Sequence, residues 1–111
     1  MSDTNQPPVE EADVVETSAA MEAGALLVDV REDFEWSAGH ARGAVHIPMM
    51  QVPTRIDELP RDAPIYLICA TGNRSGRVAE YLTENGFARP INVRGGTVAW
   101  QRAALPIDRG E

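Results

Sequence analysis

The strongest constraint on the fold is an apolar run that leads directly into a polar loop and then a helix. Ile65–Ile68 (IYLI) lacks the polar alternation of a half-buried strand, so it predicts a strand buried on both faces. The loop Cys69–Arg74 (CATGNR) follows at once, and a helix-compatible segment runs from Ser75 to Asn85. A buried strand joined to a helix by a short loop is typical of α/β proteins with a parallel sheet.

The same alternation extends along most of the chain. Short apolar segments predict strands at 14–15, 26–30, 45–47, 65–68 and 91–93. Segments with helical spacing or helix-boundary residues predict helices at 18–23, 32–38, 53–59, 75–85 and 97–102. We therefore expect an α/β fold, with a mostly parallel sheet covered by helices on both faces. Ligands of such sheets bind beyond the carboxyl ends of the strands, which is where Cys69 lies.

The length of 111 residues fits one domain with one hydrophobic core. Residues 1–12 are polar and acidic and contain Pro7-Pro8, so we expect a flexible N-terminal tail. The remainder, residues 13–108, is predicted to be the folded domain.

The loop after the 65–68 strand has the chemistry of a nucleophilic site. Gly72 permits a positive φ and Asn73 tolerates one, so successive N–H groups can converge on one point. Converging amides at a helix N-terminus favour negative charge, and hence the thiolate of Cys69. Such a thiolate can attack a sulfane sulfur and hold it as a persulfide until a second nucleophile collects it.

Two residues of the loop have simpler interpretations as well. A lone cysteine after an apolar strand can be a small buried core residue, but the Gly-Asn-Arg-Ser sequence of residues 72–75 favours the reactive site. Arg74 can contact substrate, or it can be a solvated or packed side chain of the first helical turn. The sequence leaves both roles of Arg74 open.

The composition of the chain restricts the classes of partner that we expect it to bind. Seventeen acidic against ten basic residues give a net charge of −7, which argues against nucleic acid or an anionic membrane as the main partner. A small anionic donor remains compatible with a local cluster of amides. One cysteine cannot form an intramolecular disulfide, and two histidines at no ligand-like spacing predict no metal site. We expect a cytoplasmic protein without a cofactor.

Several polar and aromatic residues lie near the predicted site. Asp29 and Arg31 end the 26–30 strand; they can form a charged rim that orients the loop or the donor, but an Asp–Arg pair that fixes the turn is favoured. His40 follows Gly39 at a helix end and is expected to bind a local carbonyl rather than act as a base, since a thiolate needs none. Trp36 and Trp100 are expected to be core or pocket-wall residues.

These segments together resemble the single-domain rhodanese-like sulfurtransferases, over roughly residues 12–107. Besides the loop Cys69–Ser75, the resemblance rests on segments in a matching order and spacing: 28–32 (VDVRE), 34–36 (FEW), 39–41 (GHA), 43–48 (GAVHIP), 86–87 (GF), 95–100 (GGTVAW) and 105–106 (LP). Ala41 and His46 depart from the family's usual residues at positions that look structural.

The resemblance implies a central five-stranded parallel sheet and a catalytic Cys69 that carries a persulfide. It also implies a substrate-binding loop of Ala70, Thr71, Gly72, Asn73, Arg74 and Ser75. The expected reaction moves sulfur from thiosulfate or a related small anionic donor to cyanide, a small thiol or a protein acceptor.

Two other functions stay open at this point. Rhodanese-like domains without the cysteine act as docking modules, although Cys69 and the intact loop argue against that role here. Phosphatases and arsenate reductases related to the family place five residues between cysteine and arginine. This chain has only four, Ala70 to Asn73, which suits one sulfur atom better than a tetrahedral phosphate.

Overall fold

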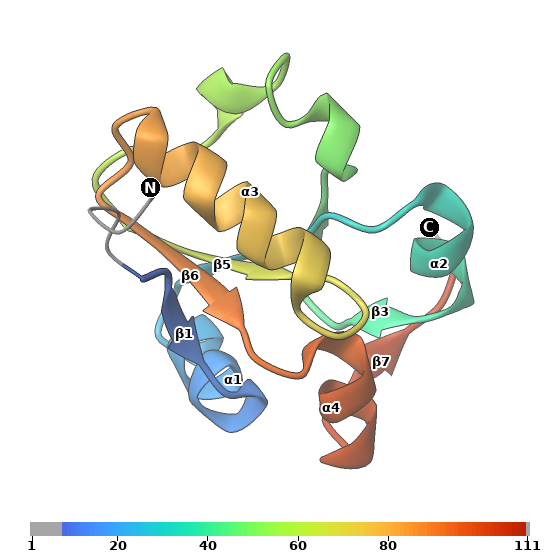
Figure 1. Cartoon of the computed structure of the whole chain (residues 1–111). Helices are drawn as coiled ribbons and strands as arrows, with labels where there is room; N and C mark the ends of the chain where they lie inside the picture. Colours follow the sequence, from blue (N-terminus) through green and yellow to red (C-terminus); the bar gives the residue numbers. More distant parts are fainter. Residues whose placement is uncertain (1–7, 111) are drawn as a thin grey trace.

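The computed structural model describes residues 8–110, which form a five-stranded parallel sheet with helices on both faces (Figure 1). The strands are β1 (Glu10–Ala12), β2 (Leu26–Asp29), β4 (Val45–His46), β5 (Pro64–Ile68) and β6 (Arg89–Val93). Their order across the sheet is β1-β6-β5-β2-β4, and each neighbouring pair is parallel. The predicted fold class is confirmed, and the strand before Cys69, β5, lies at the centre of the sheet.

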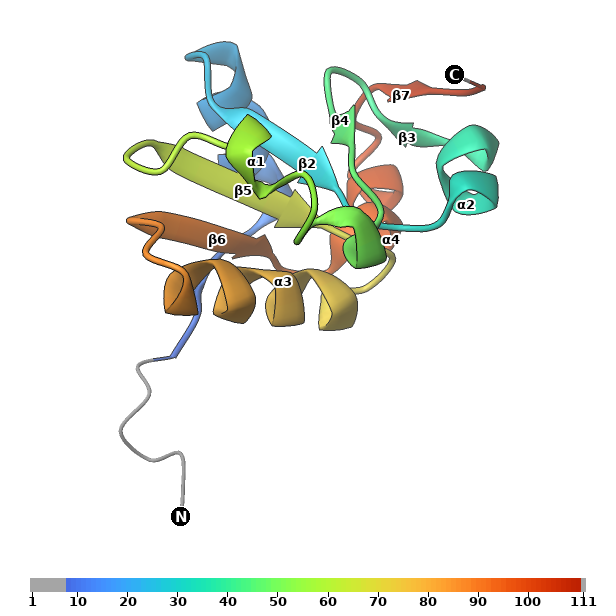
Figure 2. The same cartoon turned by 90° about the horizontal axis from the view of Figure 1, so that it is seen from above.

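The helices pack in two layers around this sheet. Helix α3 (Asn73–Glu84) covers one face, while α1 (Val14–Glu22) and α4 (Gly96–Arg102) cover the other (Figure 2). The short helix α2 (Asp33–Ala38) follows β2 beyond the carboxyl edge. A small antiparallel pair, β3 (His40–Ala41) with β7 (Ile107–Asp108), lies outside the main sheet. No helix within residues 8–110 has the length and apolar composition to cross a membrane.

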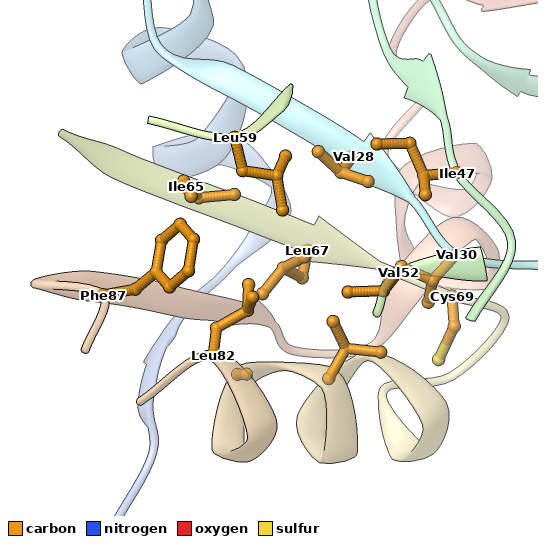
Figure 3. Packing of buried hydrophobic residues seen from close by; sticks show 12 residues of the cluster. Val28, Val30, Ile47, Val52, Leu59, Ile65, Leu67, Cys69, Leu82 and Phe87 are labelled. Atoms are coloured by element: carbon orange, nitrogen blue, oxygen red, sulfur yellow. The ribbon is translucent and has the colours of Figure 1, made fainter. Parts of the chain in front are cut away.

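Strand β5 contributes to the core on both of its faces, as its unbroken apolar run predicts. Ile65 and Leu67 pack with Val78 and Leu82 of α3, whereas Ile68 packs on the opposite side of the sheet. Full burial of such a side chain contributes roughly 1.5–3 kcal/mol. Because side chains alternate along a strand, Cys69 falls on the α3 side, and its sulfur lies beside the first turn of α3 (Figure 3).

The N-terminal region differs from the prediction at residues 10–15. Glu10–Ala12, expected in the flexible tail, form β1, which pairs with β6 in the register Glu11↔Asn92. Only Ala12 of this strand is buried, so no apolar pattern marks it. Residues 14–15, predicted as a strand, begin α1 instead, because Asp13 and Glu16 form a capping box there. Residues 1–7 of the predicted tail lie outside the described residues.

One further element was predicted wrongly, and two short strands were not predicted. The predicted helix at 53–59 is replaced by turns and one 3₁₀ segment, η3 (Ile56–Glu58); another 3₁₀ segment, η2 (Met49–Gln51), precedes it. Val52 and Leu59 still face the core, so the spacing of the apolar residues correctly indicated burial but not an α-helix. Strands β3 and β7 have two residues each, too few to leave a pattern.

Candidate active site

The loop between β5 and α3 wraps around the sulfur of Cys69. The Sγ atom accepts hydrogen bonds from the Gly72 N–H at 3.1 Å and from the Ser75 hydroxyl at 3.2 Å. Gly72 has a φ of +113°, a left-handed conformation that glycine adopts without a Cβ clash. This turn brings the chain back over Cys69 and starts α3 at Asn73. Asn73 is therefore already helical, so the prediction that Gly72 and Asn73 supply this turn together is correct only for Gly72.

Two carbonyl groups at the start of the loop, those of Cys69 and Ala70, are bound by α4. The Cys69 carbonyl accepts from the Thr97 N–H at 2.8 Å and from the Thr97 hydroxyl at 3.1 Å, and the Ala70 carbonyl accepts from the Val98 N–H at 3.1 Å. Gly96 makes this approach possible, since a Cβ there would lie 2.5 Å from both carbonyl oxygens. With these two carbonyls held by α4, the loop presents N–H groups to the Cys69 sulfur.

These donors favour the thiolate form of Cys69. Burial, the largest influence, raises the pKa of the thiol, but hydrogen bonds outweigh it and the net pKa is lowered. The contributing donors are the hydroxyl of Ser75 and the backbone N–H groups of Ser75, Gly72 and Thr71. A thiolate surrounded by fixed donors is a nucleophile that needs no separate base.

Access to the sulfur is narrow. Cys69 is 1% exposed and packs with core residues such as Val30, as expected for a core cysteine, yet its sulfur has the polar partners of a reactive one. A cavity of about 270 Å³ borders the loop at Ala70 but is not lined by Cys69 itself. Phe34, 74% exposed, and Val98 form part of the wall of this cavity. A reagent that reaches Sγ must therefore be small or have a narrow reacting end.

Arg74 is engaged by a neighbouring helix. Its Nη1 and Nη2 atoms donate to the two carboxylate oxygens of Glu35 in α2, at 2.8 and 2.9 Å. The hydrogen bond to Arg74 lowers the pKa of Glu35 to about 2. The charge of Arg74 is thus largely balanced by Glu35, and the attraction for an anion at this loop comes mainly from the amides.

The comparison with known proteins agrees with this geometry. The family model described as the rhodanese-like domain matches residues 13–103, most of the chain. The chain belongs to the rhodanese-like domain family. This agrees with the resemblance expected from the sequence segments.

Its relatives include named sulfurtransferases. A sulfurtransferase of Allochromatium vinosum is 40% identical over 82 residues, covering 74% of this chain and 77% of that protein. The thiosulfate sulfurtransferase GlpE of Glaesserella parasuis is 37% identical, covering 78% of this chain and 80% of that protein. The crystal structure of a rhodanese-related protein from Thermoplasma volcanium superposes with a TM-score of 0.79 at 29% identity, covering 89% of this chain and 97% of that one.

In this rhodanese-like domain, Asp29 and Arg31 form a closed pair at the end of β2. The carboxylate of Asp29 accepts from the Arg31 backbone N–H, Nε and Nη2, and Nη2 also donates to the Gly39 carbonyl at 2.8 Å. Asp29 is 0% exposed and Arg31 6%. This arrangement agrees with the favoured role of fixing the turn, although Arg31 also contributes to the wall of the cavity.

The histidines are held by their own surroundings. His40 Nδ1 lies 2.8 Å from the Trp36 carbonyl, which confirms the expected local hydrogen bond. The Trp36 ring stacks on the rings of His40 and His46, with centroids 3.5 and 4.7 Å apart. His46 Nε2 lies 2.8 Å from the Arg31 carbonyl. These contacts give both histidines structural roles in the segment that follows β2.

The remaining loop residues differ in how they face the sulfur. Thr71 contributes a backbone N–H to Cys69, while its side chain and that of Asn73 are exposed on the rim. Ala70 borders the cavity, and Ser75 is fully buried against the sulfur. Of the predicted loop side chains, therefore, only Ser75 forms a hydrogen bond with Cys69.

Three residues that support the loop were not predicted from the sequence: Glu35, Asn92 and Thr97. Asn92 accepts a hydrogen bond from the Ser75 hydroxyl at 2.6 Å. A polar residue in the otherwise apolar Ile91–Val93 segment was the available signal for Asn92. Glu35 and Thr97 lie in short helices whose contacts depend on the tertiary fold, so nothing local marks them.

Proposed function

We propose that this chain is a sulfurtransferase that carries sulfane sulfur as a persulfide on Cys69. The observation that carries the proposal is the pair of hydrogen bonds from the Gly72 N–H and the Ser75 hydroxyl to Sγ. Family membership and the relatives named as sulfurtransferases support it. The lowered pKa of Cys69 supports it as well, because the thiolate is the attacking form.

The proposed first step uses thiosulfate or a related small anionic donor. The Cys69 thiolate attacks the outer sulfur of thiosulfate, an S–S bond to Cys69 forms, and the bond to the inner sulfur breaks. Sulfite leaves with the electron pair, so the products are the persulfide anion and sulfite. The one-atom sulfane end of thiosulfate suits a thiol that is only 1% exposed.

The second step returns the thiolate. Cyanide, a small thiolate or the thiolate of a protein acceptor attacks the outer sulfur of the persulfide, and the Cys69 thiolate is the leaving group. With cyanide the product is thiocyanate, and charge balances without another reactant. In both steps the loop from Ala70 to Ser75 is proposed to hold the outer sulfur, with its N–H groups stabilising the charge there.

The experiment is incubation of the purified protein with thiosulfate, followed by intact-mass measurement. We expect an adduct with the mass of one sulfur atom, its loss on addition of cyanide, and release of thiocyanate. The matched variant Cys69→Ser is nearly isosteric and should take no sulfur. The proposal is wrong if the wild type gains no sulfur from any donor tried, or if Cys69→Ser gains the same mass.

The same preparation tests the two competing functions. A non-catalytic docking module would give turnover equal to buffer with several sulfur donors. A phosphatase or arsenate reductase would release phosphate from an aryl phosphate or reduce arsenate. We expect neither reaction, because only four residues separate Cys69 from Arg74 and the space enclosed by the loop is correspondingly small.

A further inference from the structure

One hydroxyl group in the loop lies between two acceptors. Ser75 Oγ is 3.2 Å from Cys69 Sγ and 2.6 Å from Asn92 Oδ1. Ser75 is 0% exposed and Asn92 5%, so water has little access to either group. A hydroxyl has a single proton to donate. It can point to the sulfur or to the amide oxygen, but not to both.

The neighbours of Asn92 decide which end of its amide faces Ser75. Asn92 Nδ2 donates to the Gly72 carbonyl at 3.0 Å and to Glu11 Oε2 at 3.3 Å. Both partners can only accept, so the NH₂ group must face them and the oxygen must face Ser75. Glu11 belongs to β1, which precedes the residues matched by the family model. Arg94 Nη1, 3.5 Å from Glu11 Oε1, holds that carboxylate in turn.

The two forms of Cys69 place different demands on this proton. When Cys69 is a thiol, its S–H can donate to Ser75 Oγ while the Ser75 proton donates to Asn92, so every group is paired. When Cys69 is a thiolate, the sulfur requires the Ser75 proton, and the Asn92 oxygen is left facing an oxygen lone pair. A buried acceptor left without its donor is costly. Asn92 therefore competes with the thiolate for the proton.

We infer that Asn92, oriented by Gly72 and Glu11, is a positioning residue that draws the Ser75 proton away from the sulfur and keeps the Cys69 thiolate more basic than the loop alone would make it. This inference rests on the proposed function for its significance, since the thiolate is the nucleophile of that reaction. A thiolate of higher pKa is intrinsically more nucleophilic. Asn92 therefore lowers the fraction of Cys69 present as thiolate but raises the reactivity of each thiolate.

The charged groups around the loop are arranged in pairs. Arg74 on α3 is bound to Glu35 of α2, Arg31 to Asp29 at the end of β2, and Arg94 to Glu11 of β1. Of these, the charge of Arg74 interacts directly with that of Cys69. Substitution of Asn92 removes one hydrogen bond from the Glu11 carboxylate of the Arg94–Glu11 pair, whether or not Ser75 is present. The difference between the two Ser75 backgrounds therefore still measures the effect of the shared proton.

The test is the rate of alkylation of Cys69 by iodoacetamide as a function of pH, without any sulfur donor. It compares the wild type, Asn92→Ala, Ser75→Ala and the double variant. Ser75→Ala should move the profile to higher pH, because a donor to the thiolate is lost. Asn92→Ala also frees the Gly72 carbonyl and loosens the loop, so its single effect mixes two causes. The double variant separates them, because only one cause acts through Ser75.

The expected result is coupling between the two positions. Below the midpoint of the pH profile, Asn92→Ala should raise the alkylation rate when Ser75 is present. The factor of increase should be about tenfold larger than the factor that Asn92→Ala produces in the Ser75→Ala background. Additive effects of the two substitutions would overturn the inference. Asn85→Ala, at the carboxyl end of α3, is the matched control and should leave the profile unchanged.

A second variant covers the case in which Asn92→Ala does not fold. Asn92→Asp keeps an acceptor oxygen toward Ser75 and adds negative charge, so the profile should move to higher pH. That shift should be smaller in the Ser75→Ala background, and an equal shift in both backgrounds would contradict the inference. Alkylation needs no sulfur donor, so the two proposals can fail separately. If the effects of the two substitutions on alkylation are additive while persulfide formation is normal, only this inference is refuted. Coupled alkylation without persulfide formation refutes only the proposed function.

Discussion

The segments that follow β2 and β5 begin side by side at one edge of the sheet but use their polar groups in opposite ways. Asp29 and Ile68 are register partners in these two strands. After β2, the carboxylate of Asp29 and the guanidinium of Arg31 satisfy each other and the Gly39 carbonyl. After β5, backbone and hydroxyl donors converge on a thiol that is neutral until it loses its proton.

This difference separates an anchor from a reactive group. The charges of Asp29 and Arg31 balance each other within the fold, so removal of the pair should mainly affect stability, although Arg31 also lines the cavity. A titratable sulfur whose donors favour its charged form is prepared for reaction. Position at the carboxyl edge does not by itself identify a reactive residue; the state of its hydrogen-bonding partners does.

Removal of Asp29 is expected to have the largest effect on stability. Asp29→Ala leaves the buried Arg31 without its counter-ion, which should lower the free energy of unfolding by about 3–5 kcal/mol. Urea denaturation measures this loss. Asp108→Ala is the matched control, because the Arg42–Asp108 pair has side chains 64% and 46% exposed and its loss should cost under about 1 kcal/mol. Equal losses in the two variants would mean that the Asp29–Arg31 pair does not anchor the turn.

The support of the reactive loop can be broken separately at Gly96. Gly96→Ala adds a Cβ that would lie 2.5 Å from the Cys69 and Ala70 carbonyl oxygens, so the loop and α4 must separate. Misplacement of the amides should slow persulfide formation from thiosulfate by about 10–100-fold, followed by intact mass over time. Gly24→Ala shares the positive φ but its Cβ meets nothing within 4 Å, so the rate should be unchanged. A normal rate in Gly96→Ala would show that separation of the loop from α4 does not disturb the donors around the Cys69 sulfur.

The sequence predicted the fold best where burial on both faces leaves a plain signal. The run at 65–68 and the helix containing Val78, Ala79 and Leu82 lie where expected. The prediction failed where stability comes from few residues: Glu10–Ala12 form an edge strand with one buried side chain, and 53–59 turns between prolines without completing a helix. Short elements of this kind depend on tertiary contacts that a local pattern does not contain.

The candidate site was predictable at its nucleophile and less so around it. Cys69 could be selected because a strand ends there and Gly72 permits the turn that follows. The partners of the loop could not, since Glu35, Asn92 and Thr97 come from three other elements and meet only in the fold. For Arg74, the sequence left substrate contact and packing open; the position of Glu35 decides what this side chain binds in the structure.

Breaking the Arg74–Glu35 ion pair beside the reactive loop is expected to have a smaller effect than the two substitutions above. Its contribution to stability depends on the Glu35 carboxylate, whose pKa is lowered from 4.5 to about 2 by the hydrogen bond to Arg74. A carboxylate with a lowered pKa stabilises the folded state above its unfolded pKa, and this contribution is lost as the pH falls from 4.5 toward 2. Because the side chains are 32% and 20% exposed, we expect Glu35→Gln to cost about 1 kcal/mol near neutral pH.

The pH dependence distinguishes this pair from a mere packing contact. The difference in unfolding free energy between the wild type and Glu35→Gln should shrink when urea denaturation is repeated at about pH 3. Glu58→Gln, in the more exposed Arg55–Glu58 pair, should show a smaller change. In Glu35→Gln, the unbalanced charge of Arg74 should also favour the Cys69 thiolate and move the alkylation profile to lower pH. An unchanged profile would mean that the amides and Ser75 alone set the charge of the sulfur, which would sharpen the contrast between the two loops further.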